Sequence, residues 1–316
     1  MGLFLGVDGG QSTTTALIGD DTGRILGWGY GGPCNHVGAS EGRPKLIHAV
    51  TDCVEQACQM AGVDPRVIHY DAACFGMSGG PEDKHAILAE ILHAERLIVT
   101  HDGMIALSGA TAGEPGVIVI AGTGSFVYAR GPSGDTVRAG GWGYVFGDEG
   151  SGFDIARQAL RAALRMEEGW GPENSLRHRL LTAAGVGDAN ELLHRFYTSE
   201  YPRPRVARFA KIVDEAAREG DRVALDILHN AAQQLAVLVA AARRQLWRDG
   251  DPVLVAHIGG VFRSEVVMGR FRMLVEMEDG IRCIKPVHNP AAGALLEAYR
   301  ASGVRVELSG VPELKA

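Results

Sequence analysis

The stretch LFLGVDGGQSTTT, residues 3–15, decides the fold that the sequence predicts. A short apolar run ends at Asp8, turns through Gly9 and Gly10 into a row of hydroxyl side chains, and resumes as an apolar run at 16–18. This pattern predicts a β-hairpin with a polar, glycine-rich turn. Glycines let backbone N–H groups approach a ligand closely, and an acid at a strand tip can hold a hydrated cation. The turn is therefore a candidate site for a metal-chelated nucleotide phosphate, with an ordinary hairpin turn as the alternative.

The chain repeats this unit 114 residues later. Alignment of positions 2–30 with 116–144 gives 9 identities without a gap. The second copy again has an apolar run, the turn Gly122-Thr123-Gly124-Ser125 and a further strand pattern, all within 117–129. Two equivalent units that each offer a phosphate-sized turn predict a duplicated fold with nucleotide in the cleft between the halves.

Three segments carry a resemblance to a known family. They are DGGQSTT at 8–14, GTGS at 122–125 and GGWGYVFGDEGS at 140–151. Together they resemble the N-acetylglucosamine kinase family of the actin/hexokinase/Hsp70 superfamily, which also includes the ATPase activators of benzoyl-CoA reductases and 2-hydroxyacyl-CoA dehydratases. The motifs run from Asp8 to about Gly293, nearly the whole chain. The resemblance implies an α/β protein with a duplicated actin-like ATPase (ribonuclease H-like) fold, in two domains around a central cleft.

The resemblance also implies a reaction and its residues. The expected activity is phosphorylation of the 6-hydroxyl of N-acetylglucosamine by ATP with Mg²⁺. Asp102 would take the proton from the attacking hydroxyl, and Asp8 would orient magnesium through water. The expected nucleotide contacts are Gly9, Gly10, Gln11, Ser12, Thr13, Gly122, Thr123, Ser125, Gly259 and Gly260. The expected sugar contacts are Asn35, His36, Ser78, Gly124, Trp142, Asp148 and Glu149.

Each of these residue types also has a purely structural interpretation. Asp102 follows a strand and could be a helix N-cap, and Asp148 or Glu149 could cap a helix that begins near 153. Asn35 could form a turn, Trp142 could be a core aromatic, and a double glycine after a strand is common turn chemistry.

The expected domains are residues 1–114 and 115–316. The expected boundary lies at 113–116, the second domain is expected to carry a helical insertion at about 153–248, and a closing helix at about 290–302 is expected to pack back on the first domain. The strands expected from apolar runs are 71–76, 97–100 and 253–258, and the helices expected from spacing are 44–62, 82–93, 290–301 and an alanine-rich helix after Asp221.

Composition limits the other classes of function. The net charge of -7 argues against a nucleic-acid surface, and the absence of a signal sequence or an 18-residue apolar run predicts a cytoplasmic protein without membrane contact. The five cysteines are odd in number and form no CxxC pair, so reduced thiols are expected. A homodimer is expected by analogy with related kinases.

Several alternative functions stay open. The segment GMSGG at 76–80 fits the nucleophile elbow of an α/β-hydrolase, with His257 or His288 as its histidine. Within the resemblance, the alternatives are a glucosamine or N-acetylmuramic acid kinase, an activator-type ATPase, and a sugar-binding regulator that has lost catalysis. An activator would need cysteines for an iron–sulfur cluster, and no pair here has convincing ligand spacing.

Overall fold

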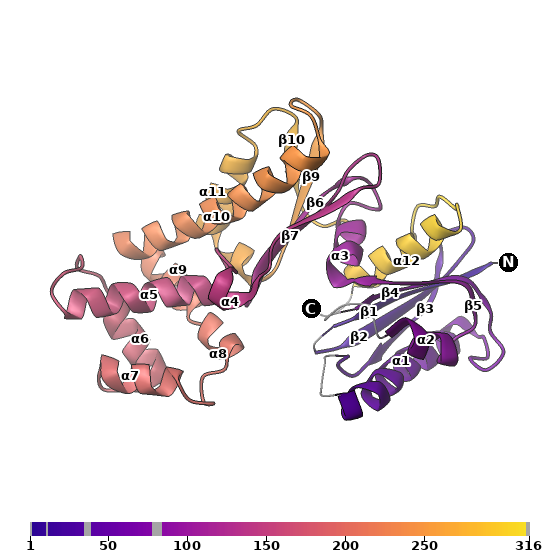
Figure 1. Cartoon of the computed structure of the whole chain (residues 1–316), viewed down its shortest axis with the longest axis horizontal. Helices are drawn as coiled ribbons and strands as arrows, with labels where there is room; N and C mark the ends of the chain where they lie inside the picture. Colours follow the sequence, from indigo (N-terminus) through magenta and orange to yellow (C-terminus); the bar gives the residue numbers. More distant parts are fainter. Residues whose placement is uncertain (1, 11, 35–38, 78–83, 314–316) are drawn as a thin grey trace. The chain divides into compact units, whose positions relative to one another are not determined.

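The computed structural model describes residues 2–10, 12–34, 39–77 and 84–313. The chain divides into two compact units, which are considered separately below (Figure 1). Unit 1 comprises Met1–Pro115 and Lys285–Ala316, and unit 2 comprises Gly116–Ile284. Unit 1 therefore includes all of 285–316, whereas the sequence led us to expect only the closing helix of this segment beside the first domain.

A five-stranded sheet forms the middle of unit 1. Its strands are β1 (Leu3–Gly9), β2 (Thr14–Asp20), β3 (Ile25–Gly31), β4 (Tyr70–Met77) and β5 (Ala94–His101), in the order β3-β2-β1-β4-β5. The hairpin strands β1, β2 and β3 are antiparallel, while β4 and β5 run parallel to β1 and to each other. The carboxyl ends of β1, β4 and β5 therefore meet at one edge of the sheet.

Helices cover both faces of this sheet, as Figure 1 shows. On one face α1 (Ala39–Ala61) and α2 (Lys84–Ile91) pack against buried side chains such as Val7 and Phe75. On the other face α12 (Pro290–Ala301) and α3 (Asp102–Ala110) pack against Phe4 and Leu17. The two apolar layers explain why the strands are apolar on both sides.

Unit 2 repeats this sheet. Its strands are β6 (Gly116–Ala121), β7 (Ser125–Arg130), β8 (Thr136–Gly140), β9 (Val253–Ile258) and β10 (Ile281–Ile284), in the order β10-β9-β6-β7-β8. The hairpin is again antiparallel, and β9 and β10 are again parallel to the first strand. Read from β8, the order is that of unit 1, which confirms the predicted duplicated actin-like α/β fold.

One part of the sequence repeat is not repeated in the structure. The letters GWGY at 27–30 lie in β3, but the same letters at 141–144 follow the end of β8 and enter the short helix α4 (Gly143–Phe146). Gly27 and Gly29 are needed because a Cβ atom would lie 2.2 and 2.1 Å from carbonyl oxygens of α1. Gly141 and Gly143 instead have positive φ angles of 74° and 79°. The same residues thus serve close packing in one unit and a turn in the other.

Helices dominate the middle of unit 2, as the insertion at 153–248 predicts. They are α5 (Gly152–Glu167), α6 (Leu176–Ala184), α7 (Ala189–Phe196), α8 (Arg203–Ala207), α9 (Ala210–Arg218) and α10 (Arg222–Leu246), followed after β9 by the 3₁₀ helix η1 (Gly260–Arg263) and α11 (Glu265–Val275). By length and composition alone α10 could cross a membrane. Its buried residues, including Leu228, Leu235 and Val239, belong to the apolar core of unit 2. This packing explains its composition without a membrane.

All five cysteines are buried and unpaired, which confirms the prediction of free thiols. Burial raises the pKa of the Cys34 and Cys283 thiols above the usual range. These side chains act as small apolar groups in the core.

The contact between α3 and α12 gives the first testable prediction. A Cβ atom on Gly293 would lie 1.9 Å from the Ile105 carbonyl oxygen and 2.4 Å from the Gly109 amide nitrogen. Both obstacles are backbone atoms, so the two helices must separate. We expect Gly293→Ala to lower the free energy of unfolding by about 2 kcal/mol. Gly269 in α11 has nothing within 4 Å of such an atom, so Gly269→Ala should instead stabilise by about 0.5 kcal/mol. Urea unfolding of both variants checks whether the two substitutions change the free energy of unfolding in opposite directions. Equal changes in the two variants would contradict the prediction.

Candidate active site

Two carboxylates lie at the carboxyl edge of the sheet in unit 1. Asp8 is in β1 and pairs in register with Gly76 of β4, which pairs with Thr100 of β5. Asp102 begins α3 directly after β5. A Cβ atom at Gly76 would lie 2.3 Å from the Ile105 side chain, so this glycine lets α3 sit close to the strand. The topology thus brings together two acids that are 94 positions apart in the sequence.

Asp102 is not the N-cap of its helix. The cap residue is His101, which makes no side-chain capping bond, and Asp102 is the first residue of α3. Its Oδ1 accepts a hydrogen bond of 2.8 Å from the Gly103 N–H. The N-cap role considered for Asp102 is therefore wrong. The Asp102 carboxylate is instead positioned by the first peptide group of the helix.

Burial, and to a smaller extent the negative charge of Asp102, raises the pKa of Asp8 to about 7. Neither a hydrogen bond nor an ion pair from the described residues reaches this carboxylate. An acid that is costly to ionise and lacks a cationic partner fits a divalent cation. Among the described residues there is no group of three or more His, Cys, Asp or Glu side chains that could ligate a metal.

This environment gives a prediction about pH and magnesium. Because the pKa of Asp8 rises from 3.8 to about 7 on folding, the folded chain holds its proton longer and the free energy of unfolding falls as pH rises through this range. A bound cation offsets that loss. We expect Mg²⁺ to raise the melting temperature more at pH 8 than at pH 6, and Asp8→Asn to be more stable than the parent by about 2 kcal/mol at pH 8 without metal. Thermal unfolding measures both; an equal Mg²⁺ shift at both pH values would contradict the assignment.

The turn after β1 is closed by its own backbone. The Gly10 N–H donates to the Thr13 carbonyl oxygen at 3.0 Å, and the Cys34 N–H donates to the Gly10 carbonyl oxygen at 3.0 Å. Ser12 and Thr13 are exposed. Among the expected nucleotide contacts, Gly9 is buried against Met77, while Gly10, Ser12 and Thr13 present the open part of the turn.

The corresponding turn of unit 2 is joined to the start of α5. The Gly152 and Phe153 N–H groups donate to the carbonyl oxygens of Gly122 and Thr123 at 2.8 and 3.4 Å. The Ser125 hydroxyl donates to the Glu149 carbonyl oxygen at 2.6 Å and is buried. Ser125 therefore holds the turn in place, while Gly122 and Thr123 remain open to a cavity.

That cavity has a volume of about 550 Å³ and lies within unit 2. Gly122, Thr123 and Gly260 line it, so the structure brings together residues from the turn after β6 and the loop after β9. Gly259 has a φ of 111°, and a Cβ there would lie 2.2 Å from the Ala121 carbonyl oxygen. Gly259 thus lets β9 end against β6. A Cβ atom on Gly260 would have nothing within 4 Å, so this residue leaves room beside the turn. The size is that of a small-ligand site.

The segment 140–151 carries three of the expected sugar residues. Trp142 is 77% exposed, which excludes its interpretation as a core aromatic. Ser151 is the N-cap of α5, so neither Asp148 nor Glu149 has the capping role considered from the sequence. Glu149 is half-buried.

Asp148 is buried and has an unusual backbone, with a positive φ of 63°. Its Oδ2 accepts from Arg203 Nη2 at 2.7 Å, and its Oδ1 accepts from the Ser125 N–H at 3.4 Å. A Cβ atom on Gly124 would lie 2.9 Å from this carboxylate, so only glycine fits there. Within unit 2, Asp148 therefore links α8 to the glycine turn.

Four of the expected residues, Gln11, Asn35, His36 and Ser78, lie outside the described residues.

A family model matches residues 5–298 of this chain. The chain belongs to the BadF/BadG/BcrA/BcrD ATPase family. Membership, together with the duplicated sheets, excludes the α/β-hydrolase alternative for residues 76–80, because that fold has one sheet and no second glycine turn.

The named relatives of this chain are amino-sugar kinases. The N-acetylmuramic acid/N-acetylglucosamine kinase of Clostridium acetobutylicum is 29% identical over 305 residues, 94% of this chain and 98% of the relative. The N-acetyl-D-glucosamine kinase of Dictyostelium discoideum is 25% identical over 95% of this chain and 98% of its own length. A solved structure from Chromobacterium violaceum, provisionally described as an N-acetylglucosamine kinase, has a TM-score of 0.71 at 29% identity and covers 94% of this chain and 98% of its own.

The cations that line the unit 2 cavity were not among the site residues expected from the sequence. Four cations line it: Arg208, which directly follows α8, Lys211 and Arg218 in α9, and Arg263 at the end of η1. They occur in amphipathic helical stretches, where a basic residue is usually just a solvated position. Only the arrangement of α8, α9 and η1 around Gly122 indicates that they could face a phosphate or a base.

Proposed function

We propose that this protein is an ATP-dependent amino-sugar kinase that phosphorylates the 6-hydroxyl of N-acetylglucosamine. The observation that carries the proposal is the pair Asp8 and Asp102 at the carboxyl edge of the unit 1 sheet. The two acids suit two roles, because Asp8, whose pKa burial raises, can hold a cation, and Asp102 stands at the start of α3, where it can meet a hydroxyl group. The kinase names of relatives that align over nearly the full chain support the same conclusion.

In the proposed reaction each residue has a limited task. Asp102 accepts the proton of the attacking hydroxyl, since phosphoryl transfer needs alignment and charge neutralisation more than covalent chemistry. The open parts of the two glycine turns, at Ser12 and Thr13 in unit 1 and at Thr123 in unit 2, would hold phosphate oxygens, and Asp8 would hold a hydrated Mg²⁺ that neutralises their charge. The unit 2 cavity beside Thr123 and Gly260 takes the adenosine.

The test is an ATP-consumption assay over N-acetylglucosamine, glucosamine, N-acetylmuramic acid, N-acetylmannosamine and glucose. We expect N-acetylglucosamine to give the highest kcat/KM. ATP turnover that is independent of every sugar would contradict the kinase assignment and favour an activator-type ATPase.

One specific alternative substrate is N-acetylmuramic acid, which the name of the Clostridium relative includes. It differs from N-acetylglucosamine by a lactyl ether with a carboxylate, so a site for both needs room and a positive charge near the sugar 3-position. The same assay separates the two. We further propose that the protein is cytoplasmic and forms a homodimer.

A further inference from the structure

The segment 140–151 carries three of the expected sugar contacts but has little packing of its own. Its helix α4 buries none of its four residues, all of which the structure describes. A single helical turn does not persist alone in water, and glycine loses more backbone freedom than other residues when it is ordered. Five of the twelve residues are glycines, and Asp148 has left-handed backbone with a φ of 63°. Contacts from outside the segment must therefore hold its shape.

Asp154, in the first turn of α5, is attached to the end of this segment. In an ordinary capping box the third helical residue accepts a hydrogen bond from the N–H of the cap residue. Here the cap residue is Ser151, and its N–H donates to the Asp148 carbonyl oxygen at 3.1 Å. The Asp154 Oδ2 instead accepts from the N–H of Gly150, the residue before the cap, at 3.1 Å. Asp154 is buried, so its loss would leave a buried N–H without an acceptor.

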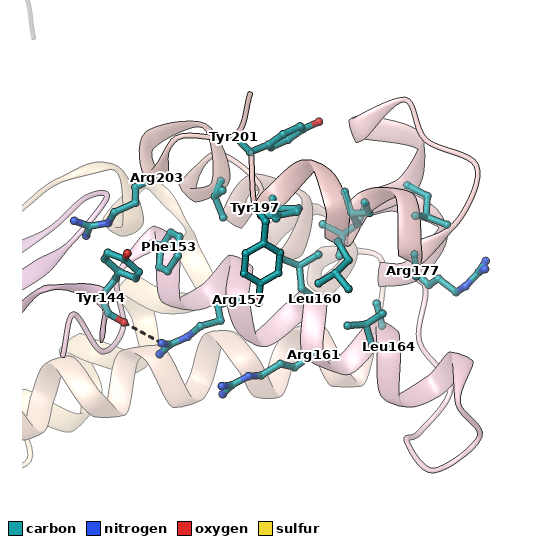
Figure 2. Close-up of a pocket in the computed structure, with 18 of the residues that line it drawn as sticks. Tyr144, Phe153, Arg157, Leu160, Arg161, Leu164, Arg177, Tyr197, Tyr201 and Arg203 are labelled. Carbon is teal, nitrogen blue, oxygen red and sulfur yellow. Dashed lines mark hydrogen bonds between the residues drawn. The ribbon is translucent and has the colours of Figure 1, made fainter. Parts of the chain in front are cut away.

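Arg157, about one turn further along α5, is attached to the middle of the segment. Its Nη2 donates to the Asp154 Oδ1 at 2.7 Å, and its Nη1 donates to the Tyr144 carbonyl oxygen at 3.1 Å, the bond drawn in Figure 2. A planar guanidinium can bridge two oxygens in fixed directions, which a lysine ammonium cannot. Asp154 and Arg157, which we call the α5 clip, thus hold the chain at Gly150 and at Tyr144.

The α5 clip also bears on Asp148, which lies between these two points. The Arg203 guanidinium pairs with Asp148 at 2.7 Å and lies 4.6 Å from the centre of the Tyr144 ring, and Figure 2 shows the two side chains together. The position of that ring depends on the backbone that Arg157 holds. Loss of the clip therefore loosens both groups that Arg203 contacts, the ring and the carboxylate.

We propose that Arg157 is a positioning residue for the sugar, a step that rests on the proposed function. Through the α5 clip it fixes residues 144–150, so that Asp148 and Glu149 are in place before the sugar binds. A site that is ordered beforehand binds more tightly, because less of the binding free energy is lost in ordering it. Loss of the clip should therefore raise the KM for sugar and leave kcat nearly unchanged, since it weakens binding rather than the chemical step.

Arg157→Ala tests the α5 clip, with Arg161→Ala as the matched control. Arg161 is one turn further along α5, is also labelled in Figure 2, and makes neither an ion pair nor a hydrogen bond with the residues that the structure describes. In hydrogen-exchange mass spectrometry of the full chain without ligand, we expect the amides of 144–151 to exchange at least about tenfold faster in Arg157→Ala, and at the parent's rate in Arg161→Ala. The KM for N-acetylglucosamine should also rise at least about tenfold in Arg157→Ala, with kcat within a few-fold of the parent.

Two further variants separate the bridge from other effects. Arg157→Lys keeps the positive charge but not the planar fork, so it should resemble Arg157→Ala in both measurements. Asp154→Asn keeps an oxygen for only one of the two groups that Asp154 binds, so it should also speed exchange of 144–151. Thermal unfolding checks that each variant folds.

Four outcomes would overturn the inference. They are exchange of 144–151 that Arg157→Ala leaves unchanged, an equal acceleration in Arg161→Ala, an Arg157→Lys enzyme that behaves as the parent, and a variant with faster exchange but the parent's KM for sugar. The exchange measurements need no activity. If no sugar is phosphorylated, the proposed function and the role in sugar binding fail together, while exchange still decides whether the α5 clip holds the segment.

Discussion

Asp102→Asn should lower kcat by at least about a hundredfold while leaving the KM for sugar within a few-fold of the parent. The amide cannot accept the proton of the attacking hydroxyl, but it keeps an oxygen in place of Oδ1. That oxygen can still accept the 2.8 Å hydrogen bond from Gly103, so the start of α3 should be preserved. Steady-state assays with sugar in excess measure the change.

Glu114→Gln is the matched control for this experiment. Glu114 is exposed in the loop after α3, and we expect its amide variant to keep the activity of the parent. An Asp102→Asn enzyme with kcat within a few-fold of the parent would remove Asp102 from the mechanism. A loss of both kcat and thermal stability would instead indicate that the carboxylate mainly supports α3.

The parts of the fold that the sequence predicted well have strong local signals. The strand β9 (Val253–Ile258) and the helix α12 (Pro290–Ala301) agree with the predicted bounds. The strand is a short apolar run closed by two glycines. The helix is preceded by its N-cap Asn289, whose side chain accepts from the Ala292 N–H at 2.9 Å. Caps and glycine pairs act within a few residues, so a single sequence is enough to find them.

Elements whose signal depends on distant contacts were predicted less well. We expected α1 to begin at 44 from the helical spacing of its apolar residues, but the helix begins at Ala39 and contains Pro44. The strand β10 has four residues and was not expected. The repeated letters GWGY lie in β3 at 27–30 but form a turn and α4 at 141–144. In each case packing against the rest of the unit outweighed the local pattern.

The candidate site also combines features that have a local sequence signal with features that depend on distant contacts. The end of β1 and the end of β5 could be recognised from motifs, and parallel pairing then brings Asp8 and Asp102 to one edge. The ion pair between Arg203 and Asp148 joins residues 55 positions apart, and nothing in the helical spacing of α8 indicates it. Long-range ion pairs of this kind leave no periodic signal along the chain.

That ion pair bears on the choice of sugar. Glucosamine has an ammonium group near neutral pH, so a site built for it should offer a free carboxylate at the 2-position, whereas an acetamide needs neutral hydrogen-bonding partners and an apolar wall. Asp148 is buried and already paired with Arg203 at 2.7 Å. Trp142, which is exposed on the same segment, can provide the apolar wall.

We therefore expect kcat/KM for N-acetylglucosamine to exceed that for glucosamine by at least about a hundredfold, since a missing partner in a hydrogen-bonding site is costly. Arg203→Ala should reduce this ratio, because it leaves the Asp148 carboxylate without its cation. The control is Arg205→Ala on the same helix. The Arg205 guanidinium lies 4.1 Å from the Tyr201 ring centre and donates to the Glu200 carbonyl oxygen, whereas that of Arg203 donates to Asp148. Steady-state kinetics with both sugars decide the matter: a parent enzyme that prefers glucosamine would exclude N-acetylglucosamine as the substrate and leave a sugar kinase of different specificity. A ratio that Arg203→Ala leaves unchanged would show that the ion pair has no part in the choice, because freeing Asp148 must favour a cationic sugar if that carboxylate reaches the 2-position.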